Sequence, residues 1–322
     1  MTEIVVSAPA RLHFGMLDPA GLGERRFGGF GVGVAWPRVV AAVRPSGPDA
    51  ADEVTASGPQ AERAAAFARR ARSALRVGGG IEVEVIEVIP PHMGLGSGTK
   101  LGLAVARGVA GVAGVAAGLE ELARASGRGA RSSVGAWTFA APGLVVEAGV
   151  PEEDQLSPLV ARFAMPEQWR CVLALPIGAE GLSGDAEERF FGQLRESEAG
   201  EPRVSRVLLT ELLPGLLADD IDEFGAALTD IQHEMGSIFA ARQGGVFHPR
   251  AAPLVDALHQ LGVGAVGQSS WGPAVYGIVD DPSRAERVAQ QLAASTGEGT
   301  DVSVVDFDRR GAFATAAARE RA

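Results

Sequence analysis

Hydrophobic and acidic residues alternate along residues 81–85, where Ile81, Val83 and Val85 are separated by Glu82 and Glu84. A period of two residues predicts a half-buried strand, because successive side chains of a strand point to opposite faces. Short apolar runs predict further strands at residues 4–7, 39–43, 144–147, 170–175, 263–266, 274–279 and 302–307. A glycine-rich hairpin region is expected between the first two of these.

Residues 61–75 carry helix-forming Ala and Arg with no internal glycine or proline, which predicts a helix. Residues 101–119 predict a second, very apolar helix, and its Gly and Ala content together with Arg107 indicates packing inside a domain rather than a membrane span. Further helices are predicted at residues 204–213, 221–242, 252–261 and 284–293. The Ala- and Arg-rich tail from Thr315 onward is expected to be a frayed helix or disordered.

The length of 322 residues suits two domains of ordinary size. Turn-prone composition around residues 151–158 places the division there, which gives domains at 1–160 and 161–322. The second half alternates predicted helices and strands in the manner of a split βαβ, ferredoxin-like unit. The expected fold class is therefore α+β.

Composition narrows the class of protein further. A hydrophobic content of 46% indicates a globular chain, and the net charge of -11 argues against nucleic acid or an anionic membrane as a partner. The single cysteine, Cys171, excludes an intrachain disulfide and lies in an apolar run that predicts a buried thiol. The first seven residues do not resemble a signal peptide, so a cytoplasmic location is expected.

The strongest local signal is the segment 91–100, PHMGLGSGTK, in which glycine recurs at alternate positions before a predicted helix start near Thr99. Glycines allow close approach of the backbone to a ligand, and a helix N-terminus presents unpaired N–H groups. Together they predict a phosphate or pyrophosphate site. The alternatives are an ordinary strand–helix connection for the loop, and for Lys100 either contact with the phosphate or exposure to solvent.

Two common phosphate loops do not fit this segment. A Walker A loop beginning at Gly94 requires glycine where Thr99 stands and Ser or Thr where Leu101 stands. The dinucleotide-binding fingerprint fails as well, because Thr99 occupies the place of its third glycine.

The segment instead resembles the second motif of the GHMP superfamily, Pro-x-x-x-Gly-Leu-Gly-Ser-Ser-Ala. Residues 8–15, APARLHFG, are similar to the first motif of that superfamily, and residues 264–276 occupy the place of the third. The resemblance covers nearly the whole chain in the right order. It implies a two-domain GHMP fold with a ribosomal-protein-S5-domain-2-like N-terminal half and a ferredoxin-like C-terminal half.

The resemblance to the kinases of the superfamily is incomplete. Where many of them carry a catalytic aspartate, residues 127–135 hold two arginines, Arg128 and Arg131, and no carboxylate. Those arginines either bind an anion or are surface charges. The third motif here contains QSSW, so Trp271 is either a seat for an aromatic acid or a core residue.

Residues 11–14, 94–99 and 268–273 together resemble the β-ribofuranosylaminobenzene 5′-phosphate synthase branch, and residues 244–247 also fit it. That resemblance implies the joining of 4-aminobenzoate or 4-hydroxybenzoate to phosphoribosyl pyrophosphate, with release of CO2 and pyrophosphate. A ring carbon attacks the sugar, so decarboxylation takes the place of proton abstraction. Lys100 and Ser133 differ from the residues expected in that branch.

The resemblance assigns residues to roles as follows. Expected catalytic residues are Arg11, His13, Arg131 and Gln268. Expected phosphate-binding residues are Gly94, Leu95, Gly96, Ser97, Gly98, Thr99, Lys100 and Arg128. Expected substrate-binding residues are Gly28, Gly29, Ser132, Ser269, Ser270 and Trp271, with His248 as a secondary candidate.

Magnesium is the expected cofactor, and its ligands are not identified beyond the guesses Asp18 and Glu147. The expected partners are the two substrates, with a homodimer as a further possibility for the superfamily. Two other functions stay open: an ATP-dependent small-molecule kinase of the GHMP family, and a non-catalytic protein that binds a phosphorylated ligand.

Overall fold

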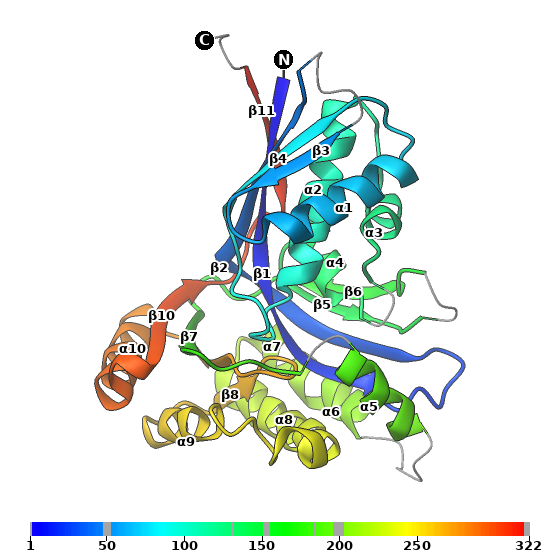
Figure 1. The fold of residues 1–322 in the computed structure, drawn as a ribbon. Coiled ribbons are helices and arrows are strands. Elements are labelled where there is room, and N and C mark those ends of the chain that lie inside the picture. The colour runs from blue at the N-terminus through cyan, green and yellow to red at the C-terminus, as the bar shows by residue number, and fades with distance from the viewer. Residues whose placement is uncertain are drawn as a thin grey trace.

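The computed structural model describes residues 2–47, 53–129, 132–150, 155–182, 185–195 and 203–318. Two sheets form the framework, and helices cover each of them (Figure 1). The predicted α+β class and the two-half GHMP arrangement are confirmed by these sheets.

The first sheet is built on two long antiparallel strands, β1 (Thr2–Asp18) and β2 (Phe27–Pro45). The sequence predicted only short strands here, because prolines and glycines normally interrupt a ladder. The pairing continues through a register shift at Pro9/Ala10. At Gly31 the two backbones approach so closely that a Cβ atom would lie 2.2 Å from the carbonyl oxygen of Leu12.

The other strands of this sheet come from both ends of the chain. The order is β11-β1-β2-β4-β3, with β5 paired to β2 and β6 paired to β5. Their bounds are β3 Val54–Ser57, β4 Ile81–Glu87, β5 Leu144–Glu147, β6 Leu159–Phe163 and β11 Phe313–Ala318.

One expectation about the C-terminal segment is wrong. The tail from Thr315 is a strand as far as Ala318, because β11 pairs antiparallel with the edge of β1. Residues 319–322 lie outside the described part of the chain. The first sheet also extends beyond residue 160, since it includes β6 and β11. A chain division at 160/161 therefore does not follow the sheets.

Four helices pack on the first sheet: α1 Ala61–Ala74, α2 Ser97–Val112, α3 Leu119–Ser126 and α4 Val134–Ala140. The helix predicted over residues 101–119 ends at Val112, and a connection with Gly114 in the left-handed region (φ +67°) leads from α2 to α3. Helix α2 is the central one, and its glycines let it approach the sheet. A Cβ on Gly108 would lie 2.3 Å from a methyl carbon of Val43.

The second sheet has the order β10-β7-β9-β8, with all neighbours antiparallel. Its strands are β7 Arg170–Pro176, β8 Ala265–Gln268, β9 Val275–Val279 and β10 Thr300–Asp306. In chain order this is the 4-1-3-2 arrangement of a split βαβ unit, which confirms the ferredoxin-like prediction. Cys171 lies on β7 and is fully buried, as predicted.

The helices of this half include the predicted segments and several that the pattern did not reveal. Their bounds are α5 Asp185–Arg195, α6 Val204–Val207, a π-helical turn Leu208–Leu212, α7 Leu213–Ala218, α8 Ile221–Gln243, α9 Ala252–Gln260, α10 Pro282–Thr296 and a 3₁₀ turn Gly297–Gly299. No helix in the described part of the chain has the length and hydropathy that a membrane span requires.

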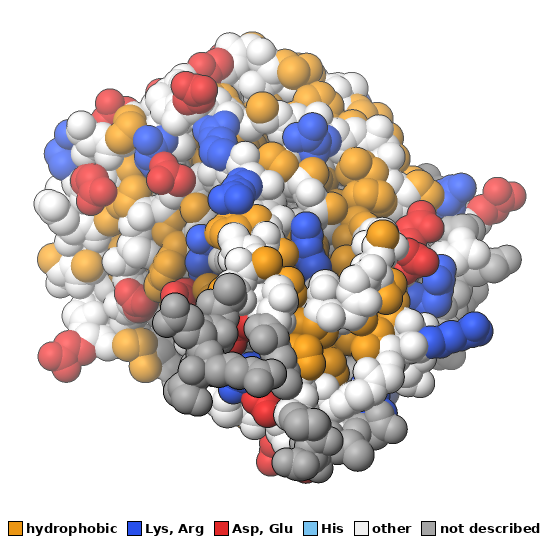
Figure 2. All heavy atoms as spheres, turned by 90° about the horizontal axis from the view of Figure 1, so that it is seen from above, with side chains coloured by type: hydrophobic (Ala, Val, Ile, Leu, Met, Phe, Trp, Pro, Cys, Tyr) orange, Lys and Arg blue, Asp and Glu red, His pale blue; other side chains and the backbone are white. Residues whose placement is uncertain are grey.

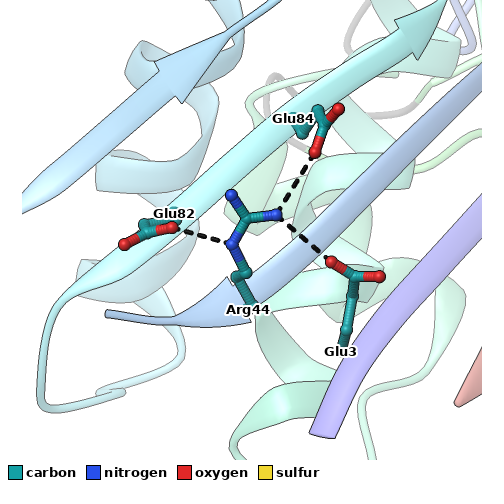
Figure 3. A network of polar contacts seen from close by, with 4 residues as sticks. All are labelled: Glu3, Arg44, Glu82 and Glu84. Atoms are coloured by element: carbon teal, nitrogen blue, oxygen red, sulfur yellow. Dashed lines mark hydrogen bonds and ion pairs between the residues drawn. The ribbon is translucent and has the colours of Figure 1, made fainter. Parts of the chain in front are cut away.

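An ion-pair cluster ties β1, β2 and β4 together on the open face of the first sheet (Figure 3). Arg44 of β2 contacts Glu3 at 3.2 Å, Glu82 at 2.7 Å and Glu84 at 3.2 Å. These carboxylates, Glu82 foremost, raise the pKa of Arg44. One guanidinium thus offsets the mutual repulsion of three carboxylates on neighbouring strands.

We expect Arg44→Met to lower the free energy of unfolding by about 1 kcal/mol at low ionic strength, because the three carboxylates then repel one another without a counter-charge. The measurement is the thermal midpoint at 20 mM and 1 M salt, and the loss should shrink at high salt through screening. Arg69→Met, at an exposed site on α1, is the control. A loss independent of salt would contradict the electrostatic explanation.

Candidate active site

A cavity of about 250 Å³ lies where the two halves of the chain meet. Strand β1 contributes Arg11 and His13 to its lining, and α2 contributes Thr99. The end of β8 contributes Gln268, and the loop after it contributes Trp271. Sequence reasoning placed all five in one site, and the fold brings them together.

The glycine loop is fixed in place by residues distant in the chain. The backbone N–H of Arg11 donates to the Leu95 carbonyl at 3.2 Å, and the Ser269 hydroxyl donates to the Gly94 carbonyl at 2.7 Å. Gly94 has φ +76°, and a Cβ there would lie 2.0 Å from the Ser269 carbonyl oxygen. Only glycine fits between the loop and Ser269, which explains the glycine at position 94.

Helix α2 begins at Ser97 without a side-chain cap, and its N-cap residue, Gly96, is left-handed with φ +78°. The first N–H groups of the helix therefore keep their hydrogen-bonding capacity for a ligand. The positive end of the helix dipole points the same way, which is the arrangement expected for anion binding.

Three arginines lie over this loop. A Cβ on Gly96 would lie 3.2 Å from Cγ of Arg11, and one on Gly98 would lie 2.8 Å from Nη2 of Arg63 and 3.3 Å from Nη2 of Arg128. The loop is therefore covered by guanidinium groups rather than bare. Arg63 was not predicted, because nothing distinguishes it in sequence from the other arginines of α1.

Arg11 is the best placed of the three to meet an anion. Its Nη1 donates to the Gly94 carbonyl, whereas its Nε is buried and has no hydrogen-bond acceptor among the described residues. Burial lowers the pKa of Arg11 to about 10, against the opposing influence of Glu187 and Glu147, so the group is still cationic at neutral pH. A buried cationic donor without an acceptor is costly unless a ligand oxygen reaches it.

Because the net charge of the chain is negative, anion binding depends on local cationic groups such as the arginines at the glycine loop. Figure 2 shows basic side chains among hydrophobic ones on the face of the molecule seen from above.

Lys100 lies away from the cavity. It is fully buried, and its Nζ donates to the Thr138 hydroxyl of α4 at 2.9 Å. Burial lowers its pKa well below the ordinary value. The solvent-exposed alternative is therefore wrong, and the side chain is directed to α4 rather than to the cavity lining.

His13 belongs to a buried polar chain. Its Nε2 lies 3.1 Å from the Ser132 hydroxyl, which in turn donates to Glu147 at 2.9 Å. The second oxygen of Glu147 accepts the backbone N–H of Ser133 at 2.7 Å. Burial, followed by the nearby Arg11, lowers the pKa of His13 to about 3, so the imidazole is neutral.

Glu147 is the site residue whose place in the chemistry the sequence did not reveal. It lies on β5, fully buried, and burial raises its pKa to about 7 despite the hydrogen bonds that it accepts. The only sequence feature that pointed to Glu147 was its position, as the next acidic residue after the segment that holds Arg128 and Arg131. Strand β2 passes between β1 and β5, and this pairing is what brings Glu147 close to His13.

Gly28 and Gly29 make this approach possible. A Cβ on Gly29 would lie 3.3 Å from the His13 ring and 2.8 Å from the Gly15 carbonyl oxygen. Gly28 has φ +62°, and a Cβ there would lie 3.2 Å from the Glu147 carbonyl oxygen. Their role is thus to admit the imidazole and β5, whereas the sequence assigned them to substrate binding.

An aromatic wall forms the other side of the cavity. Trp271 stacks on Phe239 with ring centroids 4.3 Å apart, and Phe190 and Phe191 contact it edge-on. Its indole N–H donates to Glu187 at 3.1 Å. Trp271 is only 4% exposed yet lines the cavity, so both alternatives for this residue hold in part.

The remaining polar residues of the third motif are mostly occupied within the protein. The Gln268 side chain accepts from the His248 backbone at 2.7 Å and donates to Gln243 and to the Ser270 carbonyl, each at 3.1 Å. The Ser269 hydroxyl receives the backbone N–H of His13 at 3.0 Å. These contacts fix the loop after β8 against β1.

Arg131 lies outside the described residues. Asp18 receives the backbone N–H groups of residues 21–23 and lies outside the cavity lining, and both oxygens of Glu147 already accept protein donors. The guess that either carboxylate binds magnesium therefore has no geometric support.

The described residues contain no group of three or more His, Cys, Asp or Glu side chains placed to hold a metal ion. The carboxylate at the cavity is that of Glu187. One carboxylate at the cavity fits a magnesium ion that is bound chiefly by the oxygens of a phosphorylated ligand.

Two segments match family models. Residues 61–139 match the model described as GHMP kinases N terminal domain, and residues 212–298 match GHMP kinases C terminal. The β-ribofuranosylphenol 5′-phosphate synthase of Methanothermobacter thermautotrophicus is 31% identical, over 97% of this chain and 98% of its own. The protein of the same name from Archaeoglobus fulgidus is 30% identical, over 84% of this chain and 86% of its own.

Solved structures agree on the fold. Homoserine kinase from Cytophaga hutchinsonii has a TM-score of 0.70 and 16% identity, and the match covers 97% of each chain. A structure described as MDDEF in complex with MVAPP, AMPPCP and magnesium has a TM-score of 0.65 and 12% identity, over 98% of this chain and 99% of its own.

We expect the stability of Glu147→Gln to depend less on pH than that of the unchanged protein. The pKa of Glu147 is about 7 when folded against 4.5 for the ordinary group, so the folded state binds its proton more tightly and stability falls as pH rises between these values. Above pH 7 the ionisation of buried Glu147 lowers the free energy of unfolding by its full amount, which is of the order of 3 kcal/mol.

The measurement is the free energy of unfolding in urea at pH 4.5, 6 and 8. As the pH rises, the free energy of unfolding of Glu147→Gln should increase relative to that of the unchanged protein. The influence of His13 is common to both proteins and largely cancels. Glu62→Gln, which alters an exposed carboxylate on α1, is the control. Parallel profiles for Glu147→Gln and the unchanged protein would contradict the raised pKa.

Proposed function

Because this chain belongs to the GHMP superfamily, in the branch of the β-ribofuranosylphenol 5′-phosphate synthases, we propose that it is a pentosyltransferase. It transfers ribose 5-phosphate from phosphoribosyl pyrophosphate to the ring carbon of a 4-substituted benzoate, and CO2 and pyrophosphate are released. The product belongs to methanopterin biosynthesis, which agrees with the archaeal source of the relatives.

One observation carries the proposal. A single cavity is lined by Arg11, Arg128 and Thr99 in the first turn of α2, and also by Phe239 and Trp271 of the aromatic wall. This supports the binding of a diphosphate and a benzene ring side by side. Arg11, with its buried Nε, lies at the loop, and Trp271 lies in the aromatic wall.

Pyrophosphate binding follows from the loop. The N–H groups at the start of α2 and the guanidinium groups of Arg11, Arg63 and Arg128 supply donors to the diphosphate. Magnesium, held by diphosphate oxygens with Glu187 as the protein ligand, would neutralise the charge of the leaving group. Because this charge develops as the bond to the sugar breaks, these donors stabilise the transition state more than the ground state.

The benzoate would lie against Trp271 and Phe239, where stacking orients its ring carbon toward the sugar. The name of the relatives specifies a phenol product, which favours 4-hydroxybenzoate over 4-aminobenzoate as the acceptor. The neutral imidazole of His13 lines the same cavity and provides a polar contact for the acceptor.

Purified protein with Mg²⁺, phosphoribosyl pyrophosphate and carboxyl-labelled 4-hydroxybenzoate should release labelled CO2 in equal amount to the pyrophosphate formed. Trapped CO2 and pyrophosphate are the two readouts, and omission of the sugar donor is the control. Turnover of ATP with a small alcohol, without use of phosphoribosyl pyrophosphate, would establish the kinase alternative. Ligand binding without any product would establish the non-catalytic one.

Gly96→Ala should raise the KM for phosphoribosyl pyrophosphate about tenfold, because a Cβ here would lie 3.2 Å from Cγ and 3.3 Å from Nε of Arg11 and would shift its guanidinium relative to the loop. Gly114→Ala is the matched control: it too has positive φ, but open space surrounds it. Both variants should lose stability by about 1 kcal/mol. An unchanged KM in Gly96→Ala would mean that the diphosphate is bound elsewhere.

A further inference from the structure

A buried carboxylate lies behind the cavity, and neither diphosphate binding nor ring stacking requires it. Glu147 is fully buried, and His13 and Ser132 of the cavity lining separate it from the cavity. The distances along the chain are 3.1 Å from His13 Nε2 to the Ser132 hydroxyl and 2.9 Å from that hydroxyl to Glu147. Three groups are therefore joined in line from the cavity to the interior.

The direction of the hydrogen bonds follows from the chemistry of the groups. An ionised Glu147 only accepts, so the Ser132 hydroxyl donates to it. The oxygen of Ser132 then accepts from His13 Nε2–H, which fixes the neutral tautomer. In that tautomer Nδ1 carries the lone pair, and it makes no hydrogen bond with the described residues.

We propose that His13, Ser132 and Glu147 form a proton relay that takes the phenolic proton of 4-hydroxybenzoate during attack on the sugar and returns it to the product. This inference rests on the proposed function. It adds a base to a reaction in which decarboxylation alone was expected to replace proton abstraction. It also gives the site a reason to discriminate between hydroxy and amino acceptors.

The step balances in atoms and electrons. The phenolic proton moves to His13 Nδ1, the Nε2 proton moves to Ser132, and the Ser132 proton moves to Glu147. The electron pair of the phenolate is pushed through the ring, so that the carbon bearing the carboxylate bonds to C1 of the sugar, and the C1–O bond breaks with its pair on pyrophosphate. The carbon–carboxylate bond then breaks, CO2 leaves, and its pair restores the aromatic ring as a phenolate. The relay runs backward and returns the proton.

A raised pKa of about 7 suits Glu147 to this work, because a base is most effective when its pKa lies near the operating pH. An amino acceptor does not need the relay. The nitrogen lone pair of 4-aminobenzoate already donates into the ring, and its N–H groups are far too weakly acidic for a carboxylate to remove. The relay is therefore specific to the hydroxy acceptor.

The test compares kcat and KM for 4-hydroxybenzoate and 4-aminobenzoate in the unchanged protein, Glu147→Gln and Ser132→Ala. Glu147→Gln should lower kcat with 4-hydroxybenzoate by about 100-fold, the usual size of a general-base contribution, and with 4-aminobenzoate by no more than about threefold. Ser132→Ala should show the same selectivity. Asp308→Asn, which removes another buried carboxylate outside the cavity lining, should leave the ratio of the two rates unchanged.

A second acceptor keeps the test decisive where 4-aminobenzoate is a poor substrate. The phenol of 3,5-difluoro-4-hydroxybenzoate is more acidic, so it should recover much of the activity lost in Glu147→Gln. A purely structural Glu147 would lower the rate equally with every acceptor, and that result would overturn the relay while leaving the proposed function intact. An unchanged protein that forms no product with any benzoate would overturn both.

Discussion

The candidate site depends on the continuous pairing of β1 with β2. Strand β1 carries Arg11 to the glycine loop and His13 to the cavity, and β2 separates it from Glu147 on β5. The far end of β1 reaches the second half, where Gln232 of α8 donates to the Phe14 carbonyl. A break in this ladder would separate Arg11 and His13 from Glu147, because β2 is the strand of the described sheet that pairs with both β1 and β5.

Close backbone approach is what this pairing demands, and it explains why glycine is concentrated near the site. Positions 29 and 31 of β2 face carbonyl oxygens of β1 that a Cβ would strike, and position 94 faces the carbonyl of Ser269. These glycines weaken the strand and loop locally, since they contribute no side chain to the core. The layers of the core, with α2 at the centre of the first half, compensate through burial.

Features that depend on local pattern were predictable from the sequence. The glycine loop, the helix after it and the burial of Cys171 each follow from composition or spacing within a short segment. The ferredoxin-like second half follows from the order of predicted helices and strands. Neither the place of Arg63 at the glycine loop nor the contact of Glu147 with Ser132 could be found in this way, because both arise from which strands and helices are neighbours in space. The long β1–β2 ladder was underestimated for a related reason: glycine and proline oppose strands in isolation, whereas tertiary pairing overrides that preference.

The placement of β11 has a consequence for how the molecule is assembled. The first sheet takes its edge strand from residues 313–318, so it stays incomplete during synthesis until the entire ferredoxin-like half has been made. The free edge of β1 is meanwhile exposed to wrong pairing with other chains. Biogenesis of the two halves is thereby coupled, and the strand bearing Arg11 and His13 gains its neighbour β11 only after the ferredoxin-like half has been synthesised.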